Sequence, residues 1–151
     1  MTTRPSRAIP QSILPGVFVL AVACGGNSRL REVDVRGSEY SFQAPATLPA
    51  GLTAFRFHNE GDVRHELQIF RFRAGVSAHD AALMMAQDSP LKDYRDSSLS
   101  VLVAEPGHTT SLRVLVPLAP GEVYGLRCGF QDADTLPKHV RLGMFAVVTV
   151  E

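Results

Sequence analysis

Hydrophobic and polar side chains alternate in short runs along most of the chain beyond residue 32. In the run LTAFRFHN, Phe55 and Phe57 alternate with polar residues, and in HELQIFRF, Leu67 and Ile69 share a face with His65. A period of two places the apolar side chains on one face of a strand. Turns that contain Gly or Pro, such as EGD, EPG and APGE, separate the runs. Short strands with regular turn signals predict an all-β fold, either a β-sandwich or a barrel.

One segment departs from this alternation. In GVSAHDAALMMAQDSP, Ser77 is followed three residues later by Asp80, which is typical of the start of a helix. Alanine, leucine and methionine follow, and a proline ends the run. We therefore predict one short helix at about residues 78–87, inserted between strands, and a polar loop over residues 88–98.

The first 24 residues have a third pattern. Two arginines precede the short apolar run ILPGVFVLAVA, and small residues lead into Cys24. The run is shorter than the about 20 residues that a membrane-spanning helix needs. A positive segment followed by a short apolar run is typical of a signal peptide, which we predict over residues 1–23.

The stretch LAVAC, followed by two glycines, also resembles the processing site of bacterial lipoproteins, whose cysteine is acylated and becomes the mature N-terminus. The resemblance implies a lipid on Cys24, a tether over residues 24–31 and a folded domain over residues 32–151. Such a protein would be exported and held at a membrane of the cell envelope, in the periplasm. A plain signal peptide cleaved nearby is the alternative.

Composition narrows the possible partners. The chain of 151 residues has 15 basic and 15 acidic side chains and no basic run, so we do not expect it to bind nucleic acid. Its two cysteines are Cys24 and Cys128. Exported proteins normally pair their thiols, so a lipid on Cys24 would leave Cys128 as a free buried thiol, an intermolecular bridge or a metal ligand.

Residues 127–145 hold a cysteine, a histidine and a methionine, each of which carries an atom that binds soft or borderline metals. In the run EVYGLRC the alternation points Cys128 inward at the end of a strand. His139 and Met144 follow across a loop, immediately before the last apolar run. His65 begins an earlier strand at the edge of the core, where a ring nitrogen can reach a ligand.

Together these stretches resemble the cupredoxins, the fold of the small blue-copper proteins. FRFHNEGDVRHEL is similar to the segment that carries the first imidazole ligand, and EPGHTTSLRVLVPLAPGEVYGLRC to the hairpin that leads to the cysteine ligand. The resemblance runs from about residue 33 to residue 151 and implies a Greek-key sandwich. It also implies one mononuclear copper ion, with His65, Cys128 and His139 as strong ligands and Met144 as axial ligand. Asn59 would tie the first-ligand turn to the cysteine segment from behind the ligands.

Two imidazoles, one thiolate and a weak thioether form a site that suits both Cu(I) and Cu(II). The family usually has two to four residues between the cysteine and the second histidine, whereas ten residues, GFQDADTLPK, separate them here. A longer loop would leave His139 less constrained. Three interpretations stay open: a redox copper site, a metal-free binding or assembly module on the same scaffold, and a site for zinc or stored copper without a redox cycle.

We find no signature of an enzyme. Cys128 and His139 could form a thiol–imidazole nucleophile pair, but an inward cysteine beside a methionine argues against it. Asp132 and Asp134 lie in the long loop without further support for a paired-acid role. The other histidines, at positions 58, 79 and 108, are predicted to lie on the surface. We therefore expect an exported copper protein that transfers electrons or handles copper, with an unidentified redox or envelope protein as its partner.

Overall fold

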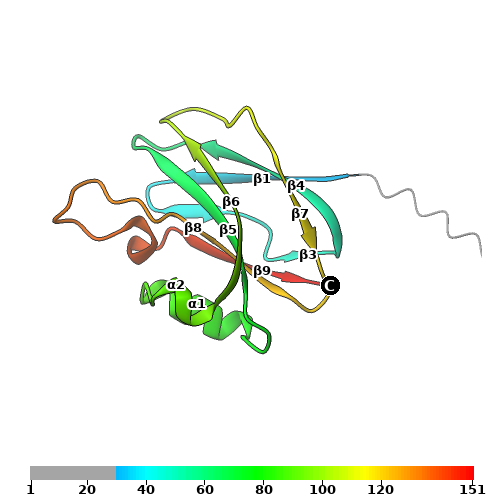
Figure 1. Cartoon of the computed structure of the whole chain (residues 1–151). Helices are drawn as coiled ribbons and strands as arrows, with labels where there is room; N and C mark the ends of the chain where they lie inside the picture. The colour runs from blue at the N-terminus through cyan, green and yellow to red at the C-terminus, as the bar shows by residue number, and fades with distance from the viewer. Residues whose placement is uncertain (1–29) are drawn as a thin grey trace, which may run out of the picture.

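The computed structural model describes residues 30–151, so the predicted signal peptide and the predicted lipid on Cys24 lie outside the described residues. The described chain forms two sheets that pack face to face, with two short helices against the outer face of one of them (Figure 1). The predicted all-β sandwich with a short inserted helix is confirmed. No helix within residues 30–151 has the length and apolar character needed to cross a membrane.

The first sheet has the strand order β2-β1-β4-β7. Its strands are β1 (Arg31–Ser38), β2 (Ser41–Gln43), β4 (Gly51–Asn59) and β7 (Val114–Leu118). β1 and β4 run parallel, and the other two pairs are antiparallel. The sheet is therefore mixed, and β4, which ends at Asn59, leads into the turn before the next strand.

The second sheet has the order β3-β9-β8-β5-β6. Its strands are β3 (Thr47–Leu48), β5 (His65–Phe72), β6 (Arg95–Ala104), β8 (Val123–Arg127) and β9 (Phe145–Val150). β3 and β9 are parallel, and the remaining pairs are antiparallel. Because β5 and β8 are antiparallel neighbours, the start of β5 and the end of β8 lie at the same end of the sandwich. That end carries His65 and Cys128.

The main core lies between the sheets and follows from the alternation. Phe55 and Phe57 of β4 and Leu67 and Ile69 of β5 are at most 2% exposed, as their period-two pattern predicts. Burying side chains of this size contributes about 1.5–3 kcal/mol each before the entropy of ordering the chain is subtracted.

The helix α1 (Ala78–Ala86) covers the outer face of the second sheet. It begins as the sequence predicts, because the Ser77 hydroxyl accepts a hydrogen bond from the backbone N–H of Asp80 at 3.1 Å. Met85 is fully buried and belongs, with Phe70 of β5, to a second core cluster. Both faces of β5 are consequently covered along part of its length, so alternate residues that would otherwise be exposed are buried as well.

The prediction of a polar loop over residues 88–98 is wrong. A single-turn helix, α2 (Leu91–Tyr94), follows α1, and β6 begins directly afterwards at Arg95. Tyr94 is 1% exposed and stacks on Phe72 with ring centroids 5.3 Å apart. The sequence is polar here because β6 is an edge strand that pairs through its backbone with β5 alone.

Candidate metal centre

Three side chains from distant parts of the chain converge at one end of the sandwich. His65 is the first residue of β5, Cys128 directly follows β8, and His139 is the first residue of the 3-10 helix η1 (His139–Leu142). Within residues 30–151 they form one group whose ligand atoms all lie within 4.8 Å of one another. All three are essentially inaccessible to solvent, with exposures of 0%, 0% and 1%.

The spacing of the donor atoms is that of ligands around a single ion. The two Nδ1 atoms are 3.0 Å apart, and Cys128 Sγ lies 3.4 Å from His139 Nδ1 and 3.9 Å from His65 Nδ1. A point equidistant from the three atoms is about 2.0 Å from each, close to the roughly 2.0–2.3 Å of metal–imidazole and metal–thiolate bonds. The three atoms thus form a trigonal set of the right size for one metal ion.

The backbone of Met144 is hydrogen-bonded to the segments that carry Cys128 and His139. Met144 is fully buried and lies between η1 and β9. Its N–H donates to the carbonyl of His139 at 2.9 Å, and its own carbonyl accepts from the N–H of Cys128 at 3.0 Å. Gly143, with φ of 112°, allows the sharp turn between η1 and Met144. The residues predicted as C-terminal ligands are therefore fixed to one another through the backbone.

The ten-residue spacer does not separate Cys128 from His139. The N–H of His139 donates to the carbonyl of Phe130 at 2.8 Å, and the N–H of Val140 donates to the carbonyl of Cys128 at 2.9 Å. Residues 131–138 form an exposed loop that projects from this end of the sandwich (Figure 1, orange). Because both ends of the loop are joined, His139 is held beside Cys128, and the expected loosening of His139 is not seen.

Asp88, which follows α1, forms ion pairs with the residue before Cys128 and with the residue before His139. Asp88 Oδ1 lies 3.3 Å from Arg127 Nη1, and Oδ2 lies 3.3 Å from Lys138 Nζ. Arg127 directly precedes Cys128, and Lys138 directly precedes His139. Although Arg127 points away from the main core, its side chain is only 5% exposed, because the α1 layer covers that face.

Asn59 supports the first histidine, but with partners other than those expected. Its side chain donates to the carbonyls of Val63 at 2.8 Å and Ala104 at 3.0 Å and accepts from the N–H of Gly61 at 3.0 Å. Ala104 is the residue of β6 that pairs with His65. Asn59 thus fixes the turn that delivers His65 to the start of β5, and its bonds tie this turn to β6 instead of to the Cys128 segment.

Burial of the group favours the neutral form of the His65 imidazole and of the Cys128 thiol. Burial, and then the nearby His139, lower the pKa of His65. Burial also raises the pKa of the Cys128 thiol, although the N–H of Glu66 donates to its sulfur at 3.4 Å. A bound cation would offset the cost of forming the thiolate in this environment.

The surroundings of His65 Nε2 also fit a metal ion at this site. Among the residues that the structure describes, buried His65 Nε2 has no hydrogen-bond partner, and Glu39 Oε1 lies 3.8 Å away. If Nδ1 of His65 carries the proton and donates to His139, Nε2 has no proton, and its lone pair faces the Glu39 carboxylate unfavourably. If Nδ1 instead binds a cation, Nε2 carries the proton and faces Glu39 favourably.

Sequence reasoning missed the role of Asp132. Its Oδ1 lies 3.0 Å from His139 Nε2, and its Oδ2 accepts a hydrogen bond from the Tyr40 hydroxyl at 2.5 Å. This hydrogen bond is the main reason why the pKa of Asp132 is lowered and that of Tyr40 raised. A carboxylate behind a ligand histidine is a recurrent arrangement, but only the folded loop shows which acid takes that place.

The remaining histidines stay apart from the cluster. His79 and His108 are exposed, as predicted. His58 is only partly exposed, because it bonds to Thr109 Oγ1 at 2.8 Å and lies 3.1 Å from Asp34.

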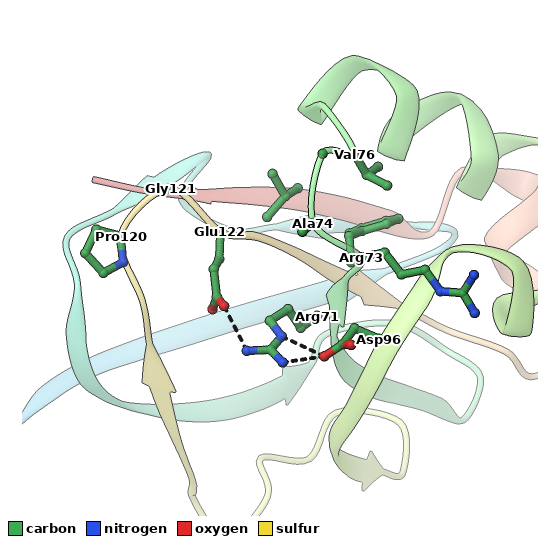
Figure 2. A pocket seen from close by; sticks show the side chains of 11 residues that line it. Arg71, Arg73, Ala74, Val76, Asp96, Pro120, Gly121 and Glu122 are labelled. Carbon is green, nitrogen blue, oxygen red and sulfur yellow. Dashed lines mark hydrogen bonds and ion pairs between the residues drawn. The ribbon is translucent and has the colours of Figure 1, made fainter.

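A hollow of about 280 Å³ lies at the opposite end of β5 and β8. Figure 2 shows that its central cation, Arg71, bonds to both neighbouring carboxylates, Asp96 and Glu122. Arg71 therefore matches the two carboxylates of this hollow, and the other cation, Arg73, donates to the carbonyl of Lys92 at 2.8 Å.

Comparison with solved protein structures identifies the fold. No family model and no curated protein matches the sequence. The solved structure of dithionite-reduced auracyanin from Roseiflexus castenholzii matches with a TM-score of 0.50 and 19% identity, over 80% of this chain and 96% of that chain. Auracyanin B matches with a TM-score of 0.50 and 20% identity, over 80% of this chain and 88% of that chain.

The chain has the cupredoxin fold. Within this cupredoxin fold the positions that the sequence resemblance assigned as ligands are brought together at one end of the sandwich. The donor set of two imidazole nitrogens and a sulfur, with a buried methionine alongside, fits one mononuclear copper ion of the blue-copper type.

Proposed function

We propose that this protein binds one copper ion through His65, Cys128 and His139, with the Met144 thioether as a fourth, weak ligand, and that it carries single electrons. The observation that supports this proposal is the buried trigonal group of two Nδ1 atoms and one Sγ. A copper ion held there would alternate between Cu(I) and Cu(II), the two states that such a donor set accommodates.

The surroundings favour a carrier over an enzyme. The three donor residues are almost completely buried, so no open position faces solvent for a substrate. Backbone hydrogen bonds hold Cys128, His139 and Met144 in place before any metal arrives. A rigid site changes little between oxidation states, which favours rapid electron exchange. The fold is shared with an auracyanin whose structure was obtained in a reduced form.

The location of the protein is part of the proposal. The pattern of residues 1–23 supports export, and LAVAC supports a lipid on Cys24 that anchors the protein at the cell envelope. Its partner would be a redox or envelope protein in that compartment. Mass spectrometry of the protein from a membrane fraction tests the anchor: an acylated N-terminal Cys24 supports it, whereas a soluble chain that begins at another residue contradicts it.

The experiment that tests the metal is a Cu(II) titration of the purified protein, followed by visible absorption. We expect an intense thiolate band that saturates at one equivalent, bleaches on reduction and is missing in Cys128→Ser, which preserves the size of the side chain. Absence of the band, with no metal bound, would leave a metal-free binding module. One equivalent of bound metal without reversible bleaching would indicate zinc or copper storage.

A further inference from the structure

The two ligand imidazoles differ in what lies behind them. Within residues 30–151, His65 Nε2 has no hydrogen-bond partner, whereas His139 Nε2 lies 3.0 Å from Asp132 Oδ1. Asp132 comes from the exposed loop and is itself bonded by the hydroxyl of Tyr40, 92 residues earlier in the chain. The segments that carry Tyr40 and Asp132, far apart in the sequence, therefore meet beside the His139 imidazole.

Tyr40 and Asp132 also shield His139 from water. The Tyr40 ring is tilted against the His139 ring with centroids 4.8 Å apart, and it lies edge-on to the His65 ring with centroids 6.2 Å apart. His139 is 1% exposed, although residues 131–138 of the loop before it are exposed. Both oxygens of Asp132 are engaged, one by His139 and one by Tyr40, so the carboxylate has a fixed orientation.

We propose that Asp132, held by Tyr40, is a positioning residue that acts through His139. It keeps the proton of His139 on Nε2, which leaves the Nδ1 lone pair directed at Cys128 and His65. Its negative charge makes the imidazole a stronger donor, which stabilises Cu(II) over Cu(I) and lowers the reduction potential of the site. The second statement rests on the proposed copper function, whereas the first concerns the protein without metal.

The physical basis is general. A carboxylate that accepts the N–H of a metal-bound imidazole fixes its tautomer and raises its basicity, and loss of such a partner typically costs about 10–100-fold in metal affinity. A more basic ligand favours the higher charge of the oxidised ion. A purely structural role for Asp132, in which it only closes the loop, would leave the reduction potential unchanged once the site has formed.

The tautomer is tested in the metal-free protein by the ¹⁵N chemical shifts of the His139 ring. In the wild type we expect the Nε2–H form alone. Asp132→Asn keeps an oxygen that accepts a hydrogen bond and should retain this form, whereas Asp132→Ala should show a mixture with the Nδ1–H form. A single, unchanged Nε2–H tautomer in Asp132→Ala would overturn this part of the inference without touching the copper proposal.

The electronic effect is tested by redox titration of the copper-loaded protein. Asp132→Asn removes the charge and keeps the shape, so its equilibrium constant for reduction should rise about tenfold or more, and its Cu(II) affinity should fall by 10–100-fold. Tyr40→Phe keeps the charge of Asp132 and releases one of its oxygens, so it should change both values by less than Asp132→Asn does. The matched control is Asp134→Asn, because Asp134 is an exposed acid of the same loop, and it should match the wild type.

Equal potentials and equal Cu(II) affinities in Asp132→Asn, Asp134→Asn and the wild type would overturn the electronic effect and leave Asp132 as a loop closure only. If the wild type binds no copper, the proposed function fails, and the tautomer measurement still decides whether Asp132 positions His139.

Discussion

The two ends of the strands β5 and β8 carry polar clusters of opposite character. At the far end, Arg71 is 37% exposed and bonds to Asp96 and Glu122 (Figure 2). At the near end, His65 and His139 are buried with their Nδ1 atoms 3.0 Å apart. The far cluster pairs a cation with two carboxylates, whereas the near cluster brings two ring nitrogens and a thiol sulfur, all metal-binding atoms, close to one another.

This difference shows how a binding site can be told from a structural cluster. Charged groups that are exposed and matched need nothing further, and their contribution to stability is small. Buried metal-binding atoms at the spacing of ligands gain from a shared cation, which offsets the cost of forming the thiolate. The type, burial and spacing of its donor atoms thus identify the near end as the binding site, although the far end has the more conspicuous charges and the hollow.

The largest expected contrast between the two ends is in metal affinity. His139→Ala removes one of three strong donors and should weaken Cu(II) binding by more than the roughly 10–100-fold that loss of a supporting partner costs. Arg71→Met should leave the affinity unchanged, because Arg71 lies at the other end of β5. Competition with a chromophoric chelator measures both values. Equal weakening in the two variants would contradict the separation of the two ends.

The second contrast is in stability. Asp88→Asn leaves Arg127 buried without its carboxylate, which should lower the free energy of unfolding by about 3 kcal/mol. Arg71→Met also breaks ion pairs, but these are part-exposed and screened by water, so its effect should be much smaller. Urea unfolding of the metal-free variants gives both numbers. A larger loss in Arg71→Met would reverse this ranking.

A third contrast uses two glycines. A Cβ added at Gly37 would lie 2.9 Å from Met144 Cε and 2.8 Å from Phe57 Cε2, so Gly37→Ala should displace Met144 and shift the thiolate band. We expect a loss of stability of about 1–3 kcal/mol, typical of overpacking. Gly125→Ala is the matched control, because the three atoms nearest its Cβ would all belong to the Phe70 ring, the closest at 2.2 Å.

Visible spectra and unfolding curves separate the two effects. Gly125→Ala should be destabilised while its copper spectrum stays that of the wild type. A wild-type spectrum in Gly37→Ala as well would show that Met144 does not influence the metal.

The smallest expected effect concerns Asp34 of β1, which belongs to neither of the two polar clusters. Hydrogen bonds from Arg56 and His58 lower the pKa of Asp34 to about 2. A carboxyl group with a depressed pKa stabilises the fold above its unfolded pKa of about 3.9, and this stabilisation is lost as the pH falls through the folded value. Because Asp34 is 41% exposed, solvent screening limits its contribution to below about 1 kcal/mol.

Asp34→Asn should therefore be slightly less stable than the wild type at pH 6, and the difference should vanish toward pH 2. Urea unfolding at the two pH values measures it. A difference that grows on acidification would show that the sign of this linkage is wrong.

Much of the fold could be predicted from local patterns. The alternation in β4 and β5 assigned Phe55, Phe57, Leu67 and Ile69 to the core, and the Ser77 cap marked the start of α1. The order of the histidines, Cys128 and Met144 along the chain indicated a cupredoxin. The polar segment 88–98 was wrongly predicted to be a loop, because an edge strand can be polar when its backbone is paired with one neighbour alone.

The sequence by itself determined which residues offer soft donors and on which strand faces they lie, because residue type and period-two alternation are local properties. Only the tertiary structure decided that ten intervening residues leave His139 beside Cys128, since the His139 N–H donates to the Phe130 carbonyl and the Val140 N–H to the Cys128 carbonyl. Only the tertiary structure brought Tyr40 to Asp132 as well. Contacts between residues so far apart depend on how the sheets pack, and no spacing along the chain encodes them.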